Sequence, residues 1–468
     1  MAELRVVVVG GGIAGLTAAW LASGAARVTL LEAGERFGGK LRGGEVGGVR
    51  VDLGAESMLA RRPEAVELAR EVGLAGELEP PTTAKAGIWT RGELRPLPAG
   101  QLMGVPGDLA ALAASGVLTE EGLRRAGRDG EAGEIGADVS IGAYVAAKLG
   151  REVVERLVEP LLGGVYAGHA DEISLRAAVP ALLPIAQRGG PLAEGVRELT
   201  SRPSAGGPVF QGLRGGLGTL PEAVAAAARR NGAELRTGSP VEELRRTPEG
   251  WRIVSNGEVL HADRVVLAVP APVAAKLLVD ELPSAAAELS QVEYAGMALV
   301  TMAFRRADLA GAGLAGSGFL VPPVDGRRIK ASTFSSNKWG WLERSAPDEF
   351  LLRTSLGRHR EVAVLELPDE ELVGRSLADL AEAVGLRARP YDTAVTRWPG
   401  GLPQYPVGHL DRVARIRSAV AGLGGLAVCG AAYDGVGIPA CIASARRAVN
   451  EMVTPAAGAP VREGRMGA

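Results

Sequence analysis

The pattern that most constrains the fold lies between residues 6 and 32. A run of β-branched residues, Val6–Val9, is followed by Gly10-Gly11-Gly12-Ile13-Ala14-Gly15, a helical stretch and a second apolar run, Arg27–Leu31. Such continuous apolar runs are typical of parallel strands covered on both faces. The spacing G-x-G-x-x-G between a strand and a helix is the fingerprint of a dinucleotide-binding β-α-β unit. We therefore interpret the segment as the start of a Rossmann-type domain and not as a signal peptide.

The glycine segment and Glu32 have distinct expected roles at a dinucleotide. Gly10 permits the tight turn, Gly12 lets the backbone approach a diphosphate, and Gly15 lets the helix pack on the strand. The helix N-terminus favours the diphosphate, so the predicted contacts are Gly10, Gly11, Gly12, Ile13, Ala14 and Gly15. At the end of the second strand, Glu32 can accept hydrogen bonds from ribose hydroxyls and would repel a 2′-phosphate, which disfavours NADP. The alternative is a glycine turn in an unrelated α/β protein.

Two further segments favour FAD over NAD. Residues 32–40 (EAGERFGGK) resemble the E-x(3)-R-x-G-G motif of the amine oxidase and porphyrinogen oxidase flavoproteins. Arg36 and Lys40 can neutralise the diphosphate there, although a solvated basic loop has the same composition. Residues 430–439 (GAAYDGVGIP) join a short strand to a helix, and the glycines beside Val436 let the chain lie against a flat ring. The N-terminus of that helix can stabilise negative charge on a reduced flavin; the alternative is a plain strand-to-helix loop.

Composition argues against several other functions. The chain of 468 residues has a net charge of −2 and no basic block, so no nucleic acid is expected as a partner. Two cysteines and four scattered histidines have no metal-ligand spacing, so no metal is expected, and a cytoplasmic location is the default. No later apolar run reaches the ~20 residues of a membrane span, while peripheral contact with the inner face of a membrane stays open. A monomer and a homodimer are equally open.

The pattern along the chain predicts an α/β fold (α+β overall) with discontinuous domains. A Rossmann-type FAD-binding domain is expected from residues 1–75, 206–288 and 396–455. An Ala- and Leu-rich helical pattern predicts a helical insertion at 76–205, which can face a membrane. Period-2 alternation predicts an antiparallel-sheet substrate domain at 289–395, with a helix at 369–384, and residues 456–468 are expected to be a flexible tail.

Four more segments carry a family resemblance. They are Gly54–Arg62 (GAESMLARR), Glu159–Gly168 (EPLLGGVYAG), the RW, PQY and GH elements of Arg397–His409, and Gly435–Ile442 (GVGIPACI). Together with the cofactor segments, they resemble the oxygen-dependent coproporphyrinogen/protoporphyrinogen oxidases of haem biosynthesis, over nearly the whole chain. Amine oxidases and carotenoid desaturases share the first motif but not the Tyr-Ala-Gly and Pro-Gln-Tyr segments.

The resemblance implies an FAD enzyme that removes six electrons from a porphyrinogen, with oxygen re-oxidising the flavin and releasing peroxide. Carried over by position, FAD contacts are expected at Glu32, Ala33, Lys40, Val241, Trp398, Val436, Gly437 and Ile438, in addition to the glycine segment. The substrate side is expected at Gly54, Ala55, Glu56 and Ser57. Ala86 stands where mitochondrial-type protoporphyrinogen oxidases carry an Arg, and Gly104-Val105-Pro106 and Asn337-Lys338-Trp339 resemble the Gram-positive, coproporphyrinogen-oxidising branch. Coproporphyrinogen III is therefore the favoured substrate and protoporphyrinogen IX the alternative.

The substrate chemistry calls for an apolar pocket with a few cations for propionates. The candidates are Arg61, Arg62, Lys85, Arg95 and Lys338, of which Arg62 and Lys338 are preferred because basic positions recur there in the Gram-positive members. No general base stands out, and His169 is interpreted as a surface histidine. The rival functions are a flavin amine oxidase, which would need an aromatic pair that a chain with 4% aromatic residues hardly supplies, a carotenoid desaturase and a non-catalytic porphyrin carrier.

Overall fold

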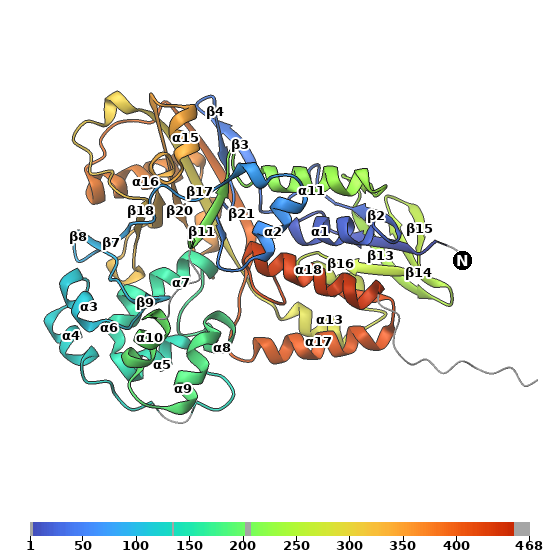
Figure 1. Ribbon diagram of the computed structural model, residues 1–468, viewed down its shortest axis with the longest axis horizontal. Helices are drawn as coiled ribbons and strands as arrows, with labels where there is room; N and C mark the ends of the chain where they lie inside the picture. Colours follow the sequence, from blue (N-terminus) through green and yellow to red (C-terminus); the bar gives the residue numbers. More distant parts are fainter. Residues whose placement is uncertain (1–2, 133–134, 202–206, 454–468) are drawn as a thin grey trace, which may run out of the picture.

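A parallel sheet of five strands forms the centre of one half of the computed structural model, which describes residues 3–132, 135–201 and 207–453. Its order is β12 (Glu234–Arg236), β2 (Arg27–Leu31), β1 (Arg5–Val9), β16 (Arg264–Leu267) and β22 (Leu426–Val428). The helices α1 (Ile13–Ala22), α2 (Glu64–Glu71), α11 (Thr219–Arg230) and α18 (Ile438–Val453) share an apolar core on one face of this sheet (Figure 1). The predicted Rossmann-type unit is therefore confirmed, and the tail predicted at 456–468 lies outside the described residues.

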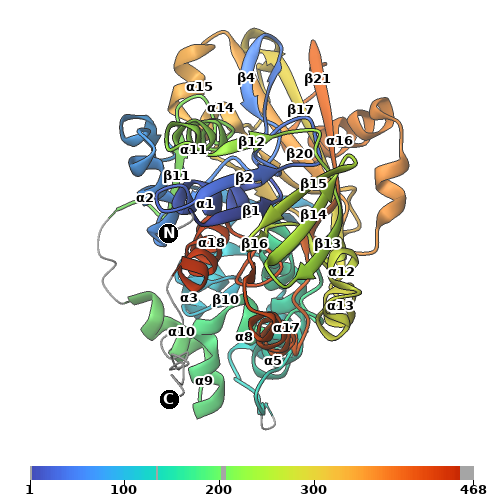
Figure 2. The same cartoon turned by 90° about the vertical axis from the view of Figure 1, so that its right-hand side faces the viewer.

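The other face of the parallel sheet is covered by an antiparallel layer and by helices. The layer consists of β13 (Val241–Thr247), β14 (Gly250–Ser255) and β15 (Glu258–Ala262). The helices are α12 (Ala271–Leu278), α13 (Pro283–Ser290) and α17 (His409–Leu423), which share a core with the layer. Figure 2 shows this layer and α11, α2 and α18 on opposite sides of the strands.

A second, seven-stranded sheet occupies the other half of the molecule. Its order is β21 (Asp392–Pro403), β17 (Tyr294–Arg305), β20 (Glu349–Leu356), β19 (Ile329–Thr333), β18 (Gly318–Leu320), β7 (Ala86–Thr90) and β8 (Glu93–Pro96). All neighbours pair antiparallel except β18 and β7. One face packs on α16 (Asp369–Val384) through Ala298, Val300, Met302 and Phe304 of β17.

The edges of this sheet depart from the boundaries expected from the sequence. β7 and β8 come from the stretch 76–205 that the pattern assigned to the helical insertion, and β21 extends to Pro403, inside the expected FAD-binding piece. β7 and β8 form a local hairpin, and the pairing of β7 with β18, far along the chain, places that hairpin in this sheet, which a local hydrophobic pattern does not encode. The sheet thus receives strands from three separate stretches of sequence.

The helical insertion has a hydrophobic core of its own. Its helices are α3 (Leu109–Ser115), α4 (Glu120–Ala126), α5 (Ile141–Leu149), α6 (Arg151–Val153), α7 (Glu159–Tyr166), α8 (Leu175–Ala178), α9 (Leu183–Arg188) and α10 (Leu192–Ser201). The short strands β9 (Gln101–Leu102) and β10 (Val105–Pro106) accompany them. A π-helical turn, Val154–Val158, lies between α6 and α7. Within the described residues, no helix combines the length and apolar character needed to cross a membrane.

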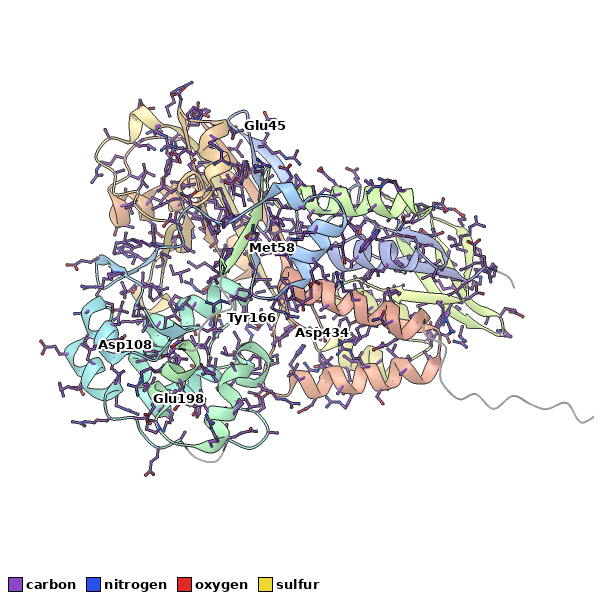
Figure 3. The ribbon with its side chains drawn as sticks, viewed as in Figure 1. Glu45, Met58, Asp108, Tyr166, Glu198 and Asp434 are labelled. Atoms are coloured by element: carbon purple, nitrogen blue, oxygen red, sulfur yellow. The ribbon has the colours of Figure 1, made fainter. Side chains whose placement is uncertain are left out.

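Short elements join the two halves. The hairpin β3 (Gly43–Val46) and β4 (Val49–Asp52) lies in a stretch that the sequence indicated only as turn-rich. A small sheet of β5 (Met58–Leu59), β11 (Phe210–Leu213) and β6 (Leu78–Glu79) and the short helices α14 (Ser335–Lys338) and α15 (Gly340–Ser345) complete the junction. Figure 3 shows Met58, Tyr166 and Asp434 near the centre of the molecule, where its parts meet.

Candidate active site

The turn between β1 and α1 has room for a ligand at one glycine and none at its neighbours. A Cβ on Gly15 would lie 1.8 Å from the Gly10 carbonyl oxygen, and Gly10 itself has a φ of +104° with a Cβ position 2.6 Å from the Ala268 oxygen. A Cβ on Gly12, by contrast, meets no atom within 4 Å. Gly12 also begins α1 without a side-chain cap. Free N–H groups at a helix start, facing open space, fit an anionic diphosphate.

Glu32 is fixed next to this turn. One oxygen of its carboxylate accepts a hydrogen bond from the Gly11 N–H at 2.6 Å, and the other accepts from the Gly34 N–H at 2.8 Å. The backbone carbonyl of Glu32 accepts from the Ser239 N–H at 2.8 Å, so the segment that enters β13 at Val241 lies beside residues 32–34. The structure therefore gathers Glu32, Ala33 and Val241 at one end of the surface that runs from the glycine turn to the start of α18, which we call the groove.

The loop after β2 passes close to the glycine turn, as its motif predicts. The Gly38 N–H donates to the Gly11 carbonyl at 2.8 Å, and both Gly38 and Gly39 have positive φ values. The Arg36 guanidinium donates to the carbonyl oxygens of Phe37 and Gly39. The Arg36 guanidinium therefore stabilises the loop through these hydrogen bonds and is not positioned to neutralise a diphosphate.

Lys40 lies where the loop meets the first turn of α18. Its side chain is exposed to solvent, and desolvation by the surrounding protein lowers the pKa of the ammonium. Burial raises the pKa of the Cys441 thiol to about 11, while the charges of Lys40 and Arg62 act to lower it. Both cations are therefore near the N-terminus of α18.

Gly54 and Trp398 form the next part of the site. A Cβ on Gly54 would lie 2.0 Å from the Lys40 carbonyl oxygen and 3.3 Å from the Trp398 ring. The Trp398 indole N–H donates to the Leu53 carbonyl at 3.2 Å. Only a glycine allows the chain to pass between these two groups. Lys40, Gly54 and Trp398 come from three distant parts of the sequence and are brought together as predicted.

The loop that leads into α18 is held from two sides. The Tyr405 hydroxyl donates to the Ala431 carbonyl and accepts from the Gly435 N–H at 2.8 Å. On the other side, the carboxylate of Asp434 binds Arg417 at 2.6 Å and Arg447 at 2.8 Å. These hydrogen bonds hold the pKa of Asp434 down at about 2, against the effect of its burial.

The loop support also includes a buried histidine. His409 stacks on Tyr405 with ring centroids 4.0 Å apart, and its Nε2 lies 3.0 Å from the Ala432 carbonyl oxygen. Burial lowers the pKa of His409 to about 4, so the ring is neutral at physiological pH. Val436 and Gly437 remain accessible on the supported loop, and α18 begins at Ile438. Their place at the end of the groove fits a flavin ring.

The face of the seven-stranded sheet that turns away from α16 is open near Trp398. Leu299, Ser355, Ala331 and Leu320 lie side by side across four strands, and Ser355, Ala331 and Leu320 are partly exposed. Side chains in the middle of a sheet are ordinarily covered by another layer, whereas the partial exposure of these three leaves the face accessible. Gly164 and Val165 of α7 are exposed next to it, and a Cβ on Gly164 would lie 3.8 Å from Leu320 Cδ2.

A buried charge cluster stands behind the predicted substrate segment 54–57. The carboxylate of Glu56, 6% exposed, lies 2.7 Å from the Lys338 ammonium and 3.3 Å from the Arg353 guanidinium. These cations hold the pKa of Glu56 at about 2 although burial alone would raise it. Arg353 also donates to the Gly54 carbonyl at 2.6 Å, and Lys338 Nζ lies 3.5 Å from Ser57 Oγ. The sequence grouped Glu56, Ser57 and Lys338 correctly in space but missed Arg353, which no motif marks.

Most of the basic residues that were expected to bind propionates are paired with carboxylates or lie exposed at the surface. Lys338 is paired with Glu56, Arg62 with Glu64 at 2.6 Å, and Arg95 with Glu93 at 3.0 Å, while Arg61 and Lys85 are exposed. Their binding of a substrate therefore remains a prediction, and the ion pairs of the two preferred residues do not favour it.

His169 lies at the surface, as the sequence indicated, with 36% of its side chain exposed. Its ring is partly buried, with Nδ1 3.2 Å from a Glu159 oxygen and Nε2 3.2 Å from the His359 carbonyl oxygen. Hydrogen bonding to Glu159 raises the pKa of His169. Both ring nitrogens are engaged, so this residue is poorly placed to accept a substrate proton. The described residues contain no group of three or more His, Cys, Asp or Glu that could hold a metal ion.

The fold and the glycine turn define a dinucleotide-binding protein, and comparisons with known proteins identify its family. Residues 13–453 match the family model described as flavin containing amine oxidoreductase. The curated coproporphyrinogen III oxidases of Mycobacterium tuberculosis and Bacillus subtilis are 37% and 31% identical, covering 95% and 96% of this chain and 96% and 98% of their own lengths. The crystal structure named "Putative protoporphyrinogen oxidase" from Exiguobacterium sp. 255-15 has a TM-score of 0.86 at 35% identity, over 97% of this chain and 99% of that chain.

The chain therefore belongs to the flavin-containing amine oxidoreductases, within the family of the coproporphyrinogen III oxidases. A cyclohexylamine oxidase from Brevibacterium oxydans, with a TM-score of 0.67 at 18% identity, shares the fold alone. The cofactor is FAD, in agreement with the dinucleotide fingerprint and the open space at Gly12. The individual contact residues remain predictions that rest on the geometry above.

Proposed function

We propose that this protein oxidises coproporphyrinogen III to coproporphyrin III with FAD as cofactor and molecular oxygen as electron acceptor. The observation that carries the proposal is the meeting of the dinucleotide groove with an open sheet face at Trp398, in a chain 31–37% identical to named coproporphyrinogen III oxidases. Oxidation of a porphyrinogen to a porphyrin removes six electrons and six hydrogens. Three molecules of oxygen accept these electrons and are released as hydrogen peroxide. The reducing cytoplasm suits the two cysteines, which are both free thiols.

When bound, FAD supplies the acceptor for hydride from the carbon bridges of the substrate. The protein residues bind and orient the reactants. The helix starts of α1 and α18 direct N–H groups toward the cofactor, and Lys40 adds a positive charge between them. Trp398 and Val436 border the end of the groove, where they exclude water from the reacting atoms.

The substrate chemistry fits the open sheet face. The row Leu299–Ser355–Ala331–Leu320 offers a mostly apolar floor with one hydroxyl for a large tetrapyrrole. Exposed Gly164 and Val165 on α7 border the floor with little side-chain bulk. The flexible porphyrinogen can therefore approach Trp398 along the sheet, with its acidic edge groups turned away from the apolar centre.

Protoporphyrinogen IX is the second candidate substrate. The chloroplastic protoporphyrinogen oxidase of Nicotiana tabacum is 29% identical over 96% of this chain, and the Exiguobacterium structure carries a protoporphyrinogen oxidase name. Coproporphyrinogen III is favoured by the higher identity to relatives with that name and by Ala86, which stands where the mitochondrial-type enzymes have an Arg.

A steady-state comparison tests the proposal. The purified protein is expected to show a flavin absorption spectrum, and aerobic incubation with coproporphyrinogen III should give fluorescent coproporphyrin and peroxide. We expect kcat/KM to be higher for coproporphyrinogen III than for protoporphyrinogen IX. Equal values, or a preference for protoporphyrinogen IX, would overturn the choice of substrate. Binding without turnover would favour a porphyrin carrier, and turnover of tyramine or a polyamine would favour an amine oxidase.

A further inference from the structure

Two buried cations at one end of the open sheet face lack a carboxylate partner. Lys330 in β19 is 6% exposed and Arg358, just after β20, is 7% exposed. The Lys330 ammonium donates to the Gly357 carbonyl at 2.9 Å, and the Arg358 guanidinium donates to the Val321 carbonyl at 3.2 Å. Neither side chain is within ion-pair distance of a carboxylate among the described residues.

The carboxylates in the neighbourhood are already engaged elsewhere. Glu361 accepts the backbone N–H of Arg358 at 3.0 Å, and Glu159 accepts from the Ala170 N–H at 2.6 Å and contacts His169. Their charges act on Arg358 at longer range and raise its pKa, against the larger lowering by desolvation. Burial and the charge of Arg358 lower the pKa of Lys330 to about 7. Buried like charges are unfavourable unless an anion joins them.

The position of the pair connects it to the substrate floor. Lys330 precedes Ala331, a member of the floor row, at a register shift between β19 and β20. Its ammonium lies 3.9 Å from the sulfur of Met297, a partly exposed residue that pairs with Trp398 across β17 and β21. Val321, which binds Arg358, directly follows Leu320 of the floor.

We propose that Lys330 and Arg358 form a carboxylate-binding subsite that holds a propionate of the porphyrinogen. This inference rests on the proposed function and names a feature of the same site. The ammonium and the guanidinium have donors left over after their carbonyl contacts, and each can donate to a carboxylate oxygen. The subsite replaces the sequence-based choice of Arg62 and Lys338, whose charges are already paired with Glu64 and Glu56. A substrate with four propionates benefits from it more than one with two.

The test uses neutral variants of the FAD-loaded enzyme and two independent measurements. Lys330→Met and Arg358→Gln keep the size of the side chains and remove the charge. Binding of coproporphyrin III, followed by quenching of porphyrin fluorescence, is expected to weaken about 10–100-fold, because each variant removes a charge-assisted hydrogen bond. The melting temperature without porphyrin is expected to stay the same or to rise, because an unpaired buried charge has been removed.

The controls separate recognition from structure. Arg328→Gln removes an exposed positive charge two residues before Lys330 and should change neither measurement. Turnover of the tetramethyl ester of coproporphyrinogen, which has no carboxylates, should change less than threefold in the variants. Unchanged porphyrin affinity in both variants would overturn the subsite. A lowered melting temperature together with equal losses for acid and ester would assign the pair a structural role. A wild-type enzyme that oxidises no porphyrinogen would count against the proposed function instead.

Discussion

Replacing Gly12 by alanine should separate cofactor binding from folding. The Cβ would meet no protein atom within 4 Å, and the backbone at Gly12, with φ −70° and ψ 177°, is allowed for alanine. The same Cβ points into the space where the α1 N-terminus faces the diphosphate. Overpacking of that kind costs about 1–3 kcal/mol, which corresponds to about 5–150-fold weaker FAD binding. Folding stability should change by less than ~1 kcal/mol, because a less favourable N-cap is offset by the lower entropy of the unfolded chain.

The assay compares flavin content and stability in three variants. Gly12→Ala, Gly374→Ala and Gly15→Ala are purified in parallel, stripped of flavin and titrated with FAD, and the free energy of unfolding of each apoprotein is measured in urea. Gly374 lies in α16 with no atom near its Cβ position, so its variant is the matched control and should keep wild-type FAD affinity. Gly15→Ala should lose both flavin and stability, because its Cβ would lie 1.8 Å from a carbonyl oxygen.

The pattern across the variants is what tests the reasoning. Wild-type FAD affinity in Gly12→Ala would refute the assignment of the open space to the diphosphate. A large loss of apoprotein stability in Gly12→Ala would show that the glycine is needed for folding alone.

Three other variants test neighbouring parts of the site. Glu32→Ala should lower flavin content, since it removes the ribose acceptor and two backbone hydrogen bonds; undiminished flavin would contradict the ribose role. Tyr405→Phe leaves the Gly435 N–H without its acceptor, at a cost of about 1–3 kcal/mol, and should shift the flavin spectrum; an unchanged spectrum would remove the loop-supporting role. Glu56→Gln should destabilise the protein by about 3–5 kcal/mol at pH 7, because it leaves two cations unbalanced. Because the folded pKa of Glu56 is depressed to about 2, its stabilisation is present above pH ~4.5 and lost as the pH falls toward 2; urea unfolding of wild type and variant should converge over that interval.

The local hydrophobic pattern was sufficient to predict the bounds of helices and strands that depend mainly on their own residues. β2 at 27–31, α5 at 141–149 and α16 at 369–384 have the bounds that their hydrophobic period indicates. The groove could also be placed, because Gly10–Gly15, Glu32 and Gly38-Gly39 are a spaced motif whose geometry is fixed by backbone chemistry.

The hydrophobic pattern of the sequence failed to predict strands whose place in a sheet depends on pairing with distant segments. β21 contains Pro399-Gly400-Gly401, which reads as a turn, but these residues form an irregularity between the pairs Met297–Trp398 and Ala295–Leu402, opposite Gly296. The strand therefore continues through a sequence that breaks its alternation. β7 pairs with its neighbour β8 in a local hairpin, but the hairpin joins the large sheet through the parallel pairing of β7 with β18, more than two hundred residues further along the chain.

The charged residues of the site also show that sequence pattern cannot predict features that depend on contacts between distant segments. Residue type alone marked Lys338 as a candidate for binding propionates and gave no reason to consider Arg358. The fold places Glu56 2.7 Å from Lys338, whereas no carboxylate of the described residues lies within ion-pair distance of Arg358. A cation serves an anionic substrate only when the folded protein leaves its charge unbalanced, and that balance is set by contacts between distant segments. For this reason, candidate propionate ligands should be ranked by the carboxylates that surround them, a criterion that favours Lys330 and Arg358 over Arg62 and Lys338.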